Sequence, residues 1–261
     1  MFTLEGRTCV FAGASGGDGV EAVKALCKEG MNVVMMTHQL AQAQDLIHEI
    51  KELGYAGKCT AYMDGHCYEP PKTDAEVFAE IAEEFGGIDV IISNTGGPEH
   101  DDSVDTVEVE NIMRDVEHLL GGSYGMLKNA LPYLRKSKAP RVIFMTTVEG
   151  VKGGTLEGLS NAIAKGAVYS MMKNVAARLM AEGITVNAIS KGAIERKGDR
   201  PMPARPGELP KKNPEDKLPF IPAKRLGSPE DLAQAICYLA SEETSYVTGM
   251  TVELSGGLNL V

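Results

Sequence analysis

Hydrophobic and polar positions alternate with two different periods along this chain. Short apolar runs bounded by glycines or polar clusters are separated by longer segments in which apolar residues recur every three or four positions. This is the pattern of buried strands that alternate with amphipathic helices. The predicted strands are 7–12, 32–36, 59–63, 90–93, 141–145, 186–189 and 250–254. The predicted helices are 20–30, 41–53, one that is capped by Asp74 and ends at 85, a long one that ends at 134, 160–182 and 229–240. The alternation predicts one α/β domain over residues 1–261, with helices on both faces of a doubly wound parallel sheet.

A glycine-rich loop separates the first predicted strand from the first predicted helix. Its candidate cofactor-binding residues are Gly13, Ser15, Gly17, Asp18 and Gly19. Glycines let the backbone pass close to a pyrophosphate, whose charge is met by backbone N–H groups and by the positive end of the following helix. A strand, a glycine cluster and a helix in this order predict a Rossmann-type dinucleotide-binding domain of three layers, α/β/α.

The ends of the next three strands carry further candidate ligands. Thr37 and His38 follow the second strand, where an acidic residue would bind the ribose hydroxyls of NAD and repel a 2′-phosphate. No acidic residue is present there, so the sequence favours NADP(H) over NAD(H). The third and fourth strands end in candidate cofactor-binding residues, which are Asp64, Gly65, Asn94 and Gly96.

The predicted helix at 160–182 carries two rows of side chains. The apolar row, which should face the core, is Ala164, Val168, Met171, Val175 and Leu179. Beside it lies a polar row at four-residue spacing, Asn161, Lys165, Tyr169 and Lys173. Such a row drifts by about 40° per step, so only part of it can face one site. Gly183 is expected to end the helix in a left-handed conformation.

Composition narrows the class of protein. A net charge of -10 and a pI near 5.1 argue against binding to nucleic acid or to an anionic membrane surface. The five cysteines form no CxxC pair, the histidines are dispersed, and no apolar run approaches the ~20 residues of a membrane span. We therefore expect a cytoplasmic protein with free thiols and no metal. The segment 191–222, rich in Pro, Lys, Arg and Glu, is predicted to be a substrate lid. Its cations either form a solvated charged surface, which the composition favours, or close over an anionic group such as a carboxylate or phosphate.

The order of several short motifs resembles the short-chain dehydrogenase/reductase family over nearly the whole chain. These motifs are AGASGGDG, NTGG, TTVEG, NAIAK and ITVNAISKG. The resemblance implies a seven-stranded parallel sheet, a homotetramer or homodimer, and hydride transfer between a nicotinamide cofactor and a small-molecule carbonyl or alcohol. It also implies that Gly13, Gly17 and Gly19 hold the pyrophosphate, Asp64 contacts adenine, Asn94 and Gly96 flank the cofactor, and Ile194 meets the nicotinamide amide through its backbone.

The catalytic positions of the family are only partly kept. The family uses a tyrosine acid, a lysine four residues later, a serine after the fifth strand and a supporting asparagine. Lys165 matches the lysine, Thr147 stands at the serine position and Asn161 stands at the tyrosine position. The supporting asparagine falls on His118 or Leu119. Because an amide has no titratable proton, the proton must come from Glu149, His118 or water.

A second pair of residues on the same helix also matches the family's YxxxK pattern. These residues are Tyr169 and Lys173, but Tyr169 lies about 12 Å further along the helix from Asn161, and we expect its side chain to pack against the protein.

Three functions are compatible with the sequence. The leading hypothesis is an NADP-preferring oxidoreductase that reduces a carbonyl or a conjugated C=C bond. The second is a nucleotide-binding homologue without redox activity, a sensor or scaffold, and a non-redox lyase or isomerase comes third.

Overall fold

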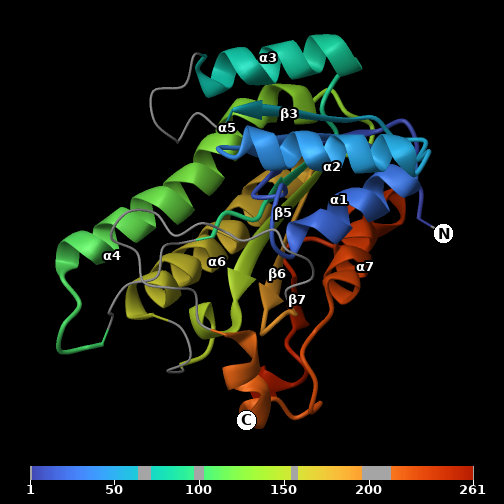
Figure 1. Ribbon diagram of the computed structural model, residues 1–261. Helices are drawn as coiled ribbons and strands as arrows, with labels where there is room; N and C mark the ends of the chain where they lie inside the picture. Colours follow the sequence, from blue (N-terminus) through green and yellow to red (C-terminus); the bar gives the residue numbers. More distant parts are fainter. Residues whose placement is uncertain (1, 64–71, 97–102, 154–157, 196–212, 261) are drawn as a thin grey trace.

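Seven parallel strands form one sheet in the order β3-β2-β1-β4-β5-β6-β7 (Figure 1). The computed structural model describes residues 2–63, 72–96, 103–153, 158–195 and 213–260. The strands are β1 Thr8–Ala12, β2 Asn32–Thr37, β3 Cys59–Met63, β4 Val90–Ser93, β5 Arg141–Thr147, β6 Thr185–Lys191 and β7 Thr251–Leu254. The chain order reverses between β1 and β4, and ligands of such sheets bind in the crevice at that point. The predicted fold class is confirmed.

Helices cover both faces of the sheet. They are α1 Gly19–Lys28, α2 Leu40–Glu52, α3 Asp74–Phe85, α4 Val109–Val116, α5 Gly122–Leu134, α6 Leu159–Leu179 and α7 Pro229–Ala240. One core cluster joins α1, α2 and α7 to the sheet through residues such as Leu26, Leu46 and Leu232. The opposite cluster joins α3, α5 and α6 through Phe78 and Val168, which completes the three layers of Figure 1.

The long helix predicted to end at 134 is not continuous. A π-helical turn, Glu117–Gly121, separates α4 from α5. Two adjacent glycines lie where the turn meets α5, since Gly121 is the last residue of the turn and Gly122 is the first of α5, and glycine lowers the local stability of a regular helix. One extra residue in a turn keeps the three- and four-residue apolar spacing on either side and changes only the phase between the two segments, and the sequence analysis did not detect that change. The turn carries His118, one of the candidate proton donors.

Strands β5 and β6 run further than predicted. They end at Thr147 and Lys191, and these two residues lie opposite each other in the parallel register. The first residue of the predicted lid at 191–222 is therefore part of the sheet. Pro214–Phe220 forms a 3-10 helix, and residues 196–212 lie outside the described residues. A lid over the crevice stays a prediction.

The ends and buried face of the helices were predicted less well than their existence. Gly183, with φ of 75°, follows the 3-10 turn after α6, as predicted. Asp74 is not the cap of α3, because Thr73 accepts the hydrogen bond from the Glu76 N–H and Asp74 is the first helical residue. On α6 the buried residues are Ser160, Ala164, Lys165, Val168, Met172, Ala176 and Leu179. Met171 and Val175 are only half-buried, because the row drifts around the helix as it lengthens.

The described ranges contain neither a membrane-spanning helix nor a candidate metal cluster. None of the helices there combines the length and the apolar composition that crossing a membrane requires. Within the same ranges, no three His, Cys, Asp or Glu residues gather where they could hold a metal ion.

Candidate active site

The carboxyl ends of β1 and β4 approach each other too closely for side chains between them. Gly13 follows β1 with φ of 73°, and a Cβ atom there would lie 2.3 Å from the carbonyl oxygen of Asn94. A Cβ atom on Gly19, the first residue of α1, would lie 2.9 Å from Cα of Ala14. Gly17 also has a positive φ of 57°. The glycines thus form a tight backbone cradle before the positive end of α1, which fits a dinucleotide pyrophosphate.

The end of β2 is tied to this cradle. The hydroxyl groups of Ser15 and Thr37 lie 2.7 Å apart, both residues are buried, and Thr37 Oγ1 accepts a hydrogen bond from the Gln39 N–H at 2.9 Å. His38 is exposed beside them. The structure therefore brings Ser15 and Thr37 together and leaves His38 as the more accessible of the two residues predicted at the ribose.

Lys165 points into the crevice from α6. Its side chain is buried, and Nζ donates to the carbonyl oxygens of Thr95 at 2.8 Å and Met145 at 3.1 Å. Those carbonyls belong to the loop after β4 and to β5. The helix is fixed against β5 because Thr146 Oγ1 donates to the Lys165 carbonyl at 3.0 Å. A buried ammonium group is thus held at the strand ends.

Thr147 ends β5 at the same edge of the sheet. Its hydroxyl oxygen is buried and makes no hydrogen bond within the described residues. Because an unsatisfied buried hydroxyl costs free energy, the group is poised to bind a ligand oxygen. Glu149 lies two residues further, half-buried in the 3-10 turn Val148–Gly150.

The start of α6 is anchored by a buried carboxylate. Ser160 Oγ donates to Asp115 Oδ2 of α4 at 2.8 Å, and both residues are fully buried. The positive amino end of α6 favours the negative charge of Asp115. Asn161 follows Ser160 in the same turn and is half-buried. This contact fixes Asn161, the residue at the family's acid position, one helical turn from Lys165.

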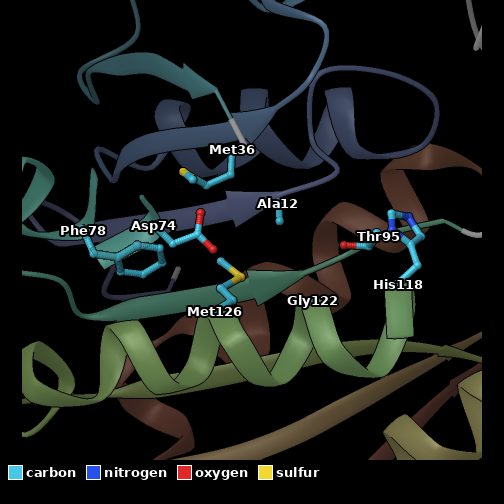
Figure 2. A pocket seen from close by; sticks show the side chains of 8 residues that line it. All are labelled: Ala12, Met36, Asp74, Phe78, Thr95, His118, Gly122 and Met126. Carbon is cyan, nitrogen blue, oxygen red and sulfur yellow. The ribbon is translucent and has the colours of Figure 1, made fainter. Parts of the chain in front are cut away.

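A pocket of about 380 Å³ opens beside the crevice (Figure 2). Its lining residues are Ala12, Met36, Asp74, Phe78, Thr95, His118, Gly122 and Met126. Figure 2 shows the His118 ring and the Thr95 side chain at the same end of the pocket, away from Phe78. Leu119, the other candidate for the supporting position, is 1 % exposed and belongs to the core. Of the two candidates, His118 is the one that faces the pocket.

The sequence did not predict the role of Lys191. Its ammonium group lies 2.7 Å from Asp18 Oδ2 and 2.9 Å from Asn94 Oδ1. The Asn94 side-chain amide donates to Asp18 Oδ1 and to the Gly13 carbonyl, each at 3.2 Å. Lys191 lies two residues beyond the predicted strand 186–189, and only this nearness to a strand end could have signalled the contact.

The remaining predicted residues are less central. Tyr169 is half-buried against the core of α3, α5 and α6, and Lys173 Nζ lies 5.6 Å from its ring centre and donates to Gly249 O at 2.6 Å. This pair shares no contact with the crevice among the described residues. Ile194 is buried and forms a β-bridge with Gly227, and Gly96 is exposed after β4. Asp64 and Gly65 lie outside the described residues.

Comparison with known proteins places these features in context. Residues 13–259 match the family model described as Enoyl-(Acyl carrier protein) reductase. The chain is 31% identical over 258 residues to the 3-oxoacyl-[acyl-carrier-protein] reductase FabG of Thermotoga maritima, covering 98% of each chain. It is 28% identical over 262 residues to the 7alpha-hydroxysteroid dehydrogenase of Clostridium sardiniense, covering 100% of this chain and 96% of the relative.

Solved structures share the fold. A 3-oxoacyl-[acyl-carrier protein] reductase from Brucella melitensis superposes with a TM-score of 0.82 at 24% identity, covering 99% of this chain and 93% of its own. A short-chain type dehydrogenase/reductase from Mycobacterium marinum superposes with a TM-score of 0.84 at 23% identity, covering 100% and 98%.

Proposed function

The chain belongs to the short-chain dehydrogenase/reductase family, and on that premise we propose that it transfers hydride between NADP(H) and a carbonyl or conjugated C=C substrate, with a proton donor other than tyrosine. One observation carries the proposal. The buried Lys165 ammonium is held near the ends of β4 and β5, at the sheet edge where the Thr147 hydroxyl also lies, which has no hydrogen-bond partner in the described part of the chain. A fixed cation and a free donor at one edge suit stabilisation of an oxygen that gains negative charge.

The glycine cradle supports binding of the cofactor. Gly13 and Gly19 allow close backbone packing at the amino end of α1, where a pyrophosphate would bind, and no acidic residue follows β2 to repel a 2′-phosphate. When bound, NADP(H) supplies the hydride. By the family resemblance, Lys165 would hold the nicotinamide ribose.

The side chains of the protein bind the substrate oxygen and supply the proton. Thr147 donates a hydrogen bond to the substrate oxygen, and Asn161 donates another through its amide without releasing a proton. His118 or Glu149, or a water molecule, supplies the proton. Of these, His118 is favoured because it lines the pocket. We propose a cytoplasmic homotetramer or homodimer that acts on a small molecule.

Oxidation of NADPH across a panel of ketones, enones and thioester substrates tests the proposal. Steady-state turnover with at least one substrate class is expected, and the conjugated and carbonyl members of the panel reveal which bond is reduced. Tight NADPH binding without turnover on any member would contradict it and favour a binding protein.

A second function, nucleotide sensing or scaffolding without redox chemistry, is favoured by one observation. Asn161 occupies the place of the family's acid and has no titratable proton. The substitution Asn161→Tyr separates the two functions. If the natural protein is an active enzyme, N161Y should change its rate by no more than about tenfold, because a donor is already in place. A gain of reductase activity that the natural protein lacks would support the sensor.

A further inference from the structure

One closed set of polar contacts joins the glycine loop after β1 to the ends of β4 and β6. Lys191 Nζ, at the end of β6, contacts Asp18 in the loop after β1 and Asn94 after β4. Asn94 Nδ2 completes the set by donating to Asp18 Oδ1 at 3.2 Å. The Asp18 and Lys191 side chains are 21% and 19% exposed, so the pair is largely shielded from water.

The position of Lys191 in the sheet places this contact across the crevice. In the strand order β6 is separated from β4 by β5, so their backbones lie about 10 Å apart. The Lys191 side chain therefore extends over the end of β5 to reach Asn94. Its backbone neighbour on β5 is Thr147, the proposed donor to the substrate oxygen. Lys191 thus shares the edge on which cofactor and substrate would meet.

The charges explain why a lysine is useful there. Asp18 occupies the N-cap position of α1 but makes no capping hydrogen bond, and it stands in the glycine loop that would hold a pyrophosphate. Burial opposes its ionisation, but the charge and hydrogen bond of Lys191, with the Asn94 hydrogen bond, lower the pKa of Asp18 below its ordinary value. The group is a carboxylate at neutral pH. An unpaired carboxylate in this loop would repel the two negative charges of a pyrophosphate.

We propose that Lys191 determines the affinity for the dinucleotide by neutralising Asp18, so that the two residues act as one unit. This role of Lys191 rests on the proposed cofactor-binding function. Lys191 does not correspond to any of the cofactor ligands that the family resemblance implies. Lys165 provides a second positive charge near the same carboxylate.

A double-mutant cycle tests the inference. NADPH binding is measured by nicotinamide fluorescence at low salt for the natural protein, K191M, K191Q, D18N and D18N/K191M. Losing the lysine alone should weaken binding by about tenfold or more, because Asp18 is then uncompensated. D18N removes the negative charge and leaves the Lys191 ammonium uncompensated, so it should not weaken NADPH binding, and D18N/K191M should return the dissociation constant to within about threefold of the natural value. The K191M effect should shrink in high salt, because screening weakens the repulsion.

The exposed pair Arg135–Glu182 provides a matched control. Its charged atoms lie 2.6 Å apart, before β5 and β6 and hence at the opposite edge of the sheet. R135M and E182Q change the net charge by the same amounts and should leave NADPH binding within about twofold. Thermal unfolding without ligand identifies any variant that fails to fold. If K191M does not fold, K191Q, which keeps a hydrogen-bond donor, replaces it in the comparison.

The possible results distinguish a failure of the proposed role of Lys191 from a failure of the proposed cofactor binding. Unchanged binding in K191M and K191Q would overturn the inference while the natural protein still binds NADPH. Binding by D18N/K191M as weak as by K191M would also overturn it, because Lys191 would then act by direct contact with the cofactor. A natural protein that binds neither NADPH nor NADH would overturn the proposed function and this inference together.

Discussion

Replacing Lys165 with methionine is expected to lower kcat/KM for NADPH-dependent reduction by about 10³-fold. Methionine keeps the length of the side chain but removes the ammonium group that donates to Thr95 and Met145. Removal of a preorganised charge from an active site typically costs ~10²–10³-fold, and loss of the ribose contact adds to that cost. Steady-state kinetics with a substrate found in the panel, together with the NADPH dissociation constant, measure the two effects separately.

Lys173 provides the matched control on the same helix. It lies two turns beyond Lys165, and its ammonium group contacts Gly249 and the Tyr169 ring. K173M should keep kcat/KM within about twofold of the natural value. Because K165M leaves two backbone carbonyls without their donor, at about 1–3 kcal/mol each, the folded fraction must be checked by thermal unfolding. A folded K165M that keeps full activity would contradict the role of Lys165. A loss of activity confined to K173M would show that Tyr169 and Lys173 form the functional pair instead.

The substitution His118→Asn is expected to lower the turnover of NADPH by about 10²-fold at pH 6, because the imidazole is the proposed proton donor. Asparagine can still donate a hydrogen bond from this position in the pocket, but it cannot release a proton. Steady-state rates of NADPH oxidation by the natural protein and by H118N, with the NADPH dissociation constant of each, measure the loss.

Glu149 is tested by the corresponding isosteric change. E149Q should alter the rate by less than about threefold if His118 is the donor. A large loss in E149Q with a normal H118N would assign the proton to Glu149. Normal rates in both variants would leave water as the donor and contradict both assignments.

Local patterns predicted the elements of this fold, and long-range contacts decided the site. The glycine loop, Thr147, Asn161 and Lys165 could be placed from strand and helix order, because parallel strands end at one edge. The π-helical turn that presents His118 leaves almost no trace in the apolar spacing. The contact of Lys191 with Asp18 joins residues 173 positions apart, and no periodicity reports such a contact.

The same limit applies to the helix that carries Lys165. Its four-residue polar row was visible in the sequence, but the anchor between Ser160 and Asp115 was not, because the partner lies on another helix. Thr73 was likewise missed as the cap of α3, because both Thr73 and Asp74 are good capping residues and only the backbone geometry distinguishes them.

The most direct test of the account is the thermal stability of the purified protein with NADPH and with NADH at equal concentrations. A ligand at 100 times its dissociation constant stabilises the folded state by about 2.7 kcal/mol, which corresponds to a rise in Tm of about 5–10 °C for a domain of this size. The account predicts such a rise with NADPH and a smaller one with NADH. A larger rise with NADH would contradict the cofactor preference, and no rise with either would contradict the proposed function.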